Sequence, residues 1–134
     1  LAGTIHVHPN GRTVYVMNRA DALMKIDGQS VFAGGDNTIA VYAIDQQTGE
    51  PTLIQNADVH AYHVRTFSFD PGGRLLVAAS IKPLPVRAGG RIVTQPAGLS
   101  VLRVSDDGRL DYVRTYDVGP ADKIHYWSGM IGLA

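Results

Sequence analysis

Two histidines and an arginine stand close together in the middle of the chain, at His60, His63 and Arg65. A neutral imidazole can take a proton from water near neutral pH, so either histidine is a candidate general base. A guanidinium presents paired donors to a carboxylate, a phosphate or an oxyanion, so Arg65 is a candidate for holding such a group. The ordinary alternatives are loop hydrogen bonds for the histidines and a salt bridge for the arginine. The sequence therefore predicts Arg65, His63 and His60 as catalytic residues.

Metal binding is the weaker interpretation of these histidines. The spacing His60-x-x-His63 suits a metal ion, but no third ligand stands nearby. His6 and His8 lie two apart on an expected strand and so point the same way. We expect His6 to line a channel wall and His8 to serve a turn. The sequence predicts no metal site and no cofactor.

A strand, a turn and a second strand come directly after the candidate residues. Residues 66–69 roughly alternate polar and apolar side chains, and residues 75–79 form a short apolar run typical of a buried strand. Between them stands Asp70-Pro71-Gly72-Gly73, in which Asp suits the first turn position, Pro presets φ at the second and Gly tolerates the last two. The candidate residues therefore lie just before the first strand of a hairpin.

This hairpin is repeated earlier in the chain. The segment HVHPNGRTVYVMN, which starts at His6, aligns with SFDPGGRLLVAAS, which starts at Ser68. Residues 38–45 likewise align with residues 98–105, and each segment leads through a glycine turn to a further strand, 52–57 or 110–116. Each copy is therefore expected to be an antiparallel meander of four strands.

A four-stranded sheet repeated at this spacing is the signature of a β-propeller blade. The alternative is a β-sandwich, which needs no internal copy. The sequence predicts an all-β fold, a partial β-propeller with a blade at 3–57, a blade at 64–116 and one closing strand at 123–133. Helical periodicity is weak, and residues 20–26 are expected to be loop.

Two blades expose strand edges on both sides. The expected partners are the remaining blades of the same propeller, supplied by a longer chain or by other copies, and we favour the longer chain. Lys and Arg together number 12, as do Asp and Glu, so a net charge of zero gives no reason to expect nucleic acid or a membrane surface. No apolar stretch is long enough to span a bilayer. The absence of cysteine removes disulfides but does not settle the compartment.

Three segments carry a family resemblance: HPNGRTVYVMNR, NTIAVYAIDQQTGEPTLIQ and RTFSFDPGGRLLVAAS. They resemble the lactonase family of seven-bladed β-propellers, which includes the propeller-type 6-phosphogluconolactonases and is related to the carboxymuconate cyclases. The resemblance implies that residues 1–134 form the C-terminal part of one propeller domain. It also matches Arg65 and Phe67 to the family motif Pro-Arg-x-Phe, with Val64 in place of the proline.

Blade geometry sorts the remaining candidates by face. The connections at 19–36 and 81–96 are long, occupy the same place in each copy and rise from the face that holds Arg65. The second is expected to be a rim or lid, or else a decorative loop. Asn18 and Arg19 end a strand on this face and could hydrogen-bond a sugar hydroxyl or phosphate; Lys82 is the equivalent in the second copy. Trp127 could stack on a sugar ring, or else belong to the core.

The favoured hypothesis is an enzyme, a lactonase-like propeller of carbohydrate metabolism that hydrolyses a small-molecule lactone, with or without a phosphate. The alternative is a non-enzymatic binding or structural module of the surface-repeat type, because only Asp21, Asp36 and Asp58 supply acidic groups near the proposed face. A bacterial protein of this kind would lie in the cytoplasm or the periplasm. One fold can serve many functions, so the residues of the site must distinguish an enzyme from a binding module.

Overall fold

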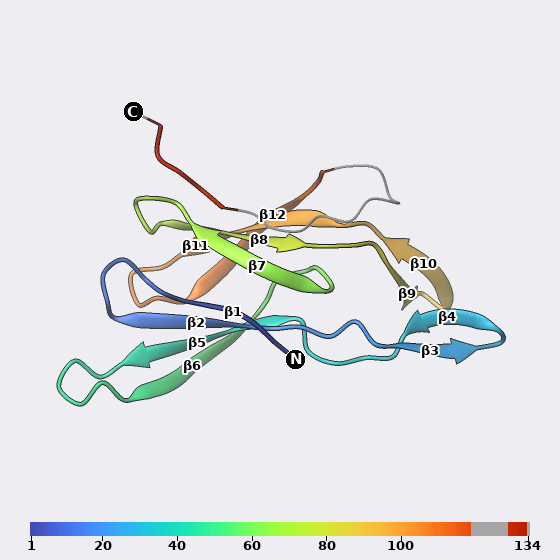
Figure 1. Cartoon of the computed structure of the whole chain (residues 1–134), viewed down its shortest axis with the longest axis horizontal. Helices are drawn as coiled ribbons and strands as arrows, with labels where there is room; N and C mark the ends of the chain where they lie inside the picture. Colours follow the sequence, from blue (N-terminus) through green and yellow to red (C-terminus); the bar gives the residue numbers. More distant parts are fainter. Residues whose placement is uncertain (119–128, 134) are drawn as a thin grey trace.

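The computed structural model describes residues 1–118 and 129–133, and its strands form two four-stranded antiparallel sheets and two smaller hairpins (Figure 1). The first sheet has the order β1-β2-β5-β6 and the second the order β12-β11-β8-β7. The strand bounds of the first sheet are Ala2–Val7 (β1), Thr13–Asn18 (β2), Thr38–Ile44 (β5) and Pro51–Asp58 (β6). Those of the second are Val64–Phe69 (β7), Leu75–Ser80 (β8), Gly98–Val104 (β11) and Leu110–Asp117 (β12). The predicted all-β fold with two four-stranded blades is confirmed.

Equivalent residues of the two repeats make the same backbone hydrogen bonds. In the first blade the N–H of His8 donates to the carbonyl of Thr13, and in the second the N–H of Asp70 donates to the carbonyl of Leu75. The pairing of β5 with β6 shifts register after Val41, and the pairing of β11 with β12 shifts after Val101. Such bulges bend a strand and increase its twist. Both blades therefore carry the same distortion at the same place.

The two sheets pack face to face, and the core lies between them (Figure 1). β2 alternates buried and half-buried side chains, as a strand with one face in a core must. Inner strand β1 lies against inner strand β7. The largest fully buried side chains of this core include Tyr15, Met17, Ile39, Phe67, Leu76 and Leu102.

The long connections are not loops, and the expectation of loop at residues 20–26 is wrong over β3. β3 (Leu23–Ile26) pairs with β4 (Gln29–Phe32), and β9 (Leu84–Ala88) pairs with β10 (Arg91–Gln95). The turns are Asp27-Gly28, with φ of 49° and 79°, and Gly89-Gly90, with φ of 57° and 77°. Two successive positive φ angles are what a two-residue hairpin turn needs, and Asp-Gly and Gly-Gly supply them readily.

The two hairpins pack on one another at the same end of the molecule, because β4 lies against β9 (Figure 1). Val31 of β4 is buried, as are Leu84 and Val86 of β9. The ring of Phe32 meets the ring of Tyr62 edge-on, with centroids 5.1 Å apart. The connections thus form a second small apolar cluster beyond the ends of the sheets.

The predicted closing strand at 123–133 falls mostly outside the described residues, which resume at Gly129. Residues 129–133 do not lie in a strand. The N–H of Met130 donates to the hydroxyl of Ser68 on β7, at 3.3 Å. The described part of the chain contains no helix that could cross a bilayer.

Tyr15 joins the two blades at the end opposite the hairpins. Its buried hydroxyl donates to the carbonyl of Gly108 at 2.7 Å and accepts a hydrogen bond from Thr13 at 3.2 Å. A buried carbonyl that loses its donor costs free energy because no water replaces the partner. This hydrogen bond is therefore part of what holds the blades in register.

We expect Tyr15→Phe to lower the free energy of unfolding by about 1–2 kcal/mol, since it leaves the Gly108 carbonyl buried and unpaired. Denaturant unfolding of the protein at its full natural length measures this. Tyr42→Phe is the matched control, because the Tyr42 hydroxyl makes no hydrogen bond among the described residues. Equal costs for the two variants would contradict the assignment.

Candidate functional site

Four charged or titratable side chains meet where β2 and β8 end, and we call them the His63 cluster: Arg19, Asp21, His63 and Lys82. Nη1 of Arg19 lies 2.9 Å from Nε2 of His63. Nδ1 of His63 lies 3.4 Å from Oδ2 of Asp21, and Nζ of Lys82 donates to the same oxygen at 3.0 Å. The cluster joins the two blades, because Arg19 and Asp21 follow β2 while His63 and Lys82 flank β7 and β8.

The backbone around His63 is held by one amide side chain. Oδ1 of Asn37 accepts hydrogen bonds from the N–H groups of His63 at 2.8 Å and Ala20 at 3.2 Å. Nδ2 of Asn37 donates to the carbonyl of Ala20 at 3.2 Å. His63 has a φ of 49°, a conformation that side chains other than glycine seldom adopt without support. Asn37 supplies that support.

The contacts of His63 fix its protonation. A guanidinium only donates, so Nε2 of His63 accepts from Arg19 and the proton of the neutral ring lies on Nδ1. Nδ1 faces Asp21 at 3.4 Å but makes no hydrogen bond within the described residues. Burial lowers the pKa of His63 below its usual range; Asp21 opposes this effect, whereas Lys82, Arg19 and Arg65 reinforce it. The hydrogen bond from Lys82 is the main cause that lowers the pKa of Asp21. His63 is therefore neutral beside an ionised Asp21 at pH 7.

Arg19 also lines a pocket with Arg65, so the structure brings together two of the predicted site residues from different blades. The pocket has a volume of about 210 Å³ and is completed by residues 2–4 of β1. Gly3 permits this geometry, since a Cβ there would lie 3.0 Å from the side chain of Met17 and 3.3 Å from the carbonyl of Arg65. Arg65 of inner strand β7 and Arg19, which follows β2, together make this pocket suitable for an anion or a polarised carbonyl oxygen.

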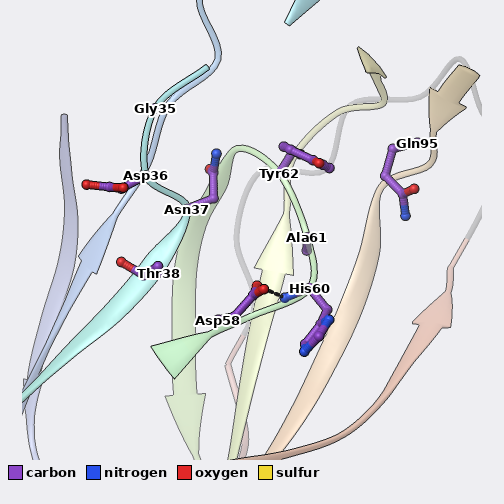
Figure 2. A pocket seen from close by; sticks show the side chains of 9 residues that line it. All are labelled: Gly35, Asp36, Asn37, Thr38, Asp58, His60, Ala61, Tyr62 and Gln95. Carbon is purple, nitrogen blue, oxygen red and sulfur yellow. Dashed lines mark hydrogen bonds between the residues drawn. The ribbon is translucent and has the colours of Figure 1, made fainter. Parts of the chain in front are cut away.

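His60 lies in a different pocket, of about 440 Å³, which shares no lining residue with the first (Figure 2). Its backbone N–H donates to Oδ1 of Asp58 at 2.7 Å, and its ring lies 4.0 Å from the ring of Tyr112. Asp36 and Tyr62 also line this pocket. His63 lines neither pocket, although only two residues stand between it and His60 in sequence.

The other predicted residues have varied surroundings. Nδ2 of Asn18 donates to the hydroxyl of Thr38 at 3.3 Å. Nε2 of His8 lies 2.7 Å from the carbonyl of Gly73, and Nδ1 accepts from the N–H of Asn10, so His8 serves the turn as expected. Trp127 lies outside the described residues. Among the residues that are described, no three His, Cys, Asp or Glu side chains group as metal ligands would.

Sequence reasoning missed the roles of Asp21 and Asn37. In the sequence, Asp21 stands out only as one of few acidic groups near the face, and Asn37 only as part of a strand motif. Both come from the connection between β2 and β5, whose path the hairpin β3–β4 sets. The available signal was the Asp27-Gly28 turn, since a hairpin brings both ends of the connection back to the sheet.

The protonation of His63 makes stability depend on pH. An unfolded histidine has a pKa of about 6.5, whereas the folded pKa is lower, so the unfolded state binds more protons as the pH falls. We expect the free energy of unfolding to decrease between about pH 7 and pH 5, and the decrease to be smaller in His63→Gln. Denaturant unfolding across this range measures the slope. An unchanged slope in the variant would contradict the assignment.

Comparisons with known proteins agree with the fold. A family model described as lactonase, 7-bladed β-propeller, matches residues 1–83. Over 76 residues the chain is 33% identical to a 6-phosphogluconolactonase of Bacillus subtilis and 26% identical to one of Formosa agariphila. Each alignment covers 57% of this chain and 18% of the relative, so the chain spans about a fifth of the length of these relatives.

A solved structure shows the same fold. It is the periplasmic gluconolactonase PpgL of Pseudomonas aeruginosa, with a TM-score of 0.62 and 22% identity. The alignment covers 92% of this chain and 27% of the solved chain, so both four-stranded sheets correspond to a part of a larger protein. The family match covers more than half of the chain and the fold agrees with it. The chain therefore belongs to the lactonase family of seven-bladed β-propellers.

Proposed function

We propose that this chain contributes to the substrate site of a propeller enzyme that hydrolyses a sugar lactone. The single observation that carries the proposal is the pocket at the inner strands, which Arg19 and Arg65 line together. The names of the curated relatives, 6-phosphogluconolactonase, support a phosphorylated sugar lactone as the substrate. The solved neighbour is described as a gluconolactonase, which supports the same reaction on a lactone without phosphate.

The reaction explains why cationic donors would be needed. Water adds to the lactone carbonyl, negative charge develops on the carbonyl oxygen, and the ring C–O bond then breaks to give a carboxylate and a hydroxyl group. Donors aimed at the developing charge stabilise the transition state more than the substrate. Arg65 would polarise the carbonyl oxygen or hold an anionic group of the substrate, and Arg19 would share this work from the other blade.

Activation of water was predicted for His63 or His60. His63 is kept neutral, as a base must be, but its Nε2 already accepts a hydrogen bond from Arg19. His60 has its ring against Tyr112, in the pocket that Arg65 does not line. These contacts favour a binding role for this region over proton transfer, and we assign the chain the binding of the substrate oxygens.

The remaining predicted ligands are assigned in the same way. Lys82 is paired with Asp21, so we place it in the His63 cluster rather than against the substrate. Asn18 stands next to Arg19 at the end of β2 and would bind a sugar hydroxyl, and stacking by Trp127 stays a prediction. The relatives and the solved neighbour support a compartment in the cytoplasm or the periplasm of a bacterium.

We expect Arg65→Ala to lower kcat/KM for a sugar δ-lactone by roughly 100-fold, the cost of removing a donor from a developing oxyanion. Arg65→Lys should recover part of the loss, because it restores the charge but not the paired donors. Arg103→Ala, which removes an exposed arginine of β11, is the matched control and should leave turnover unchanged. Lactone hydrolysis by the protein at its full natural length is followed by the acid released.

A pair of substrates separates the two roles of Arg65. If Arg65 holds a substrate phosphate, its loss should affect the phosphorylated lactone far more than the parent lactone. If it polarises the carbonyl, both should suffer alike. Equal turnover by wild type and Arg65→Ala would remove Arg65 from the mechanism. No turnover by either protein on any δ-lactone would favour the alternative, a propeller that binds without catalysis.

A further inference from the structure

We infer that His63 and Asp21 are positioning residues, which orient the Arg19 guanidinium in the pocket it shares with Arg65. This inference rests on the proposed function for its catalytic consequence, but the arrangement of protons and donors that it requires can be tested without any activity. The juxtaposition that carries it is the sequence of contacts from Lys82 through Asp21 and His63 to Arg19.

The first step concerns how Arg19 is held. Its Nη1 donates to His63, while its Nε is buried and has no partner among the described residues. A guanidinium is planar and long, with several rotatable bonds behind it, so a hydrogen bond at its end largely sets the orientation of its plane. His63 is thus the described group that decides where the other donors of Arg19 point.

The second step concerns how His63 is held. The side chain is only 6% exposed, and Asn37 fixes its backbone. A half-turn of the imidazole about its Cβ–Cγ bond would still exchange the places of Nδ1 and Cδ2 and of Nε2 and Cε1, and the neutral ring could carry its proton on either nitrogen. The carboxylate of Asp21 lies 3.4 Å from Nδ1 without a hydrogen bond, and its negative charge favours the tautomer that carries the proton on Nδ1 and leaves Nε2 free to accept from Arg19.

The third step concerns Asp21 itself. Its side chain is only half-buried, yet Nζ of Lys82 bonds to the same oxygen that faces His63. This pairing holds the carboxylate in place and keeps it ionised. Each residue in this series thus orients a residue of the other blade. Lys82 and His63 flank strands of the second blade, whereas Asp21 and Arg19 follow the last residue of β2.

The charged groups that face His63 are Asp21, Lys82, Arg19 and Arg65. A protonated His63 could not accept a hydrogen bond from Arg19, because both ring nitrogens would then be donors. Loss of the Asp21 charge would have a related effect by allowing the proton to move to Nε2. In either case Arg19 would lose its acceptor and its orientation, while Arg65 would stay in place.

A double-mutant cycle in the protein at its full natural length tests the link to Arg19. Asp21→Asn should raise KM for a sugar lactone roughly three- to tenfold, with kcat changed less, and Asp21→Glu should restore part of the loss. In an Arg19→Gln background, Asp21→Asn should add nothing further. Additive effects would overturn the inference. Asp27→Asn is the matched control, because it makes the same chemical change at the exposed tip of the hairpin β3–β4 and should leave KM unchanged.

A spectroscopic test keeps the inference separate from the proposed function. ¹⁵N NMR of the His63 imidazole at pH 7 should show the Nδ1–H tautomer in the wild-type protein, and a shift toward Nε2–H in both Asp21→Asn and Arg19→Gln. An Nε2–H tautomer in the wild type, or no change in either variant, would overturn the inference. If the tautomer behaves as expected but no lactone is hydrolysed, the proposed function fails and the positioning of Arg19 stands.

Discussion

Burial of apolar side chains between two twisted sheets is the interaction on which the rest of this structure depends. Tyr15, Ile39, Phe67 and Leu102 are removed from water there, and apolar burial is the dominant favourable contribution to folding. The packing also brings β1 beside β7, which in turn places Arg19 and Arg65 on the same pocket. The pocket therefore needs both blades, because Arg19 comes from the first and Arg65 from the second.

Apolar packing is not directional, so polar contacts fix the orientation of one blade relative to the other. At one end, His8 and Tyr15 bond to the carbonyls of Gly73 and Gly108 in the other blade. Two residues beyond Gly108, the side-chain amide of Gln55 pairs with both backbone groups of Leu110, at 2.9 Å and 2.7 Å, much as a neighbouring strand would. At the other end lies the His63 cluster. Contacts at both ends oppose sliding or rotation of one blade over the other.

The strands and their order could be predicted from the sequence because they depend on local signals that occur twice. Alternation in residues 66–69 and the Asp70–Gly73 turn each act over a few residues, and the repeat of this hairpin at residues 6–18 supported both. The hairpins were missed because the connections at 19–36 and 81–96 were interpreted as long loops. Their flanking strands are only four or five residues long, so alternation gave little help.

The site was predicted less well, for a physical reason. Arg19, His63, Arg65 and Lys82 were chosen because each residue type could serve a reaction. The structure places Arg19, His63 and Lys82 in one cluster, and Arg19 and Arg65 on one pocket. What each one contacts depends on side chains from the other blade and from the connection between β2 and β5. Asp21 changes the role of Lys82 by binding it, and Arg19 changes the role of His63 by occupying Nε2. Such pairings arise from the fold as a whole and leave no local pattern.

The paired hairpins have a consequence for how this protein can vary. Val31 on one hairpin and Leu84 and Val86 on the other are buried where β4 lies against β9. If either hairpin were shortened to a tight turn, the other would lose the strand against which these side chains pack and would expose them further to water. Length changes in the two connections are therefore coupled, so that natural variants should either keep both hairpins or lack both.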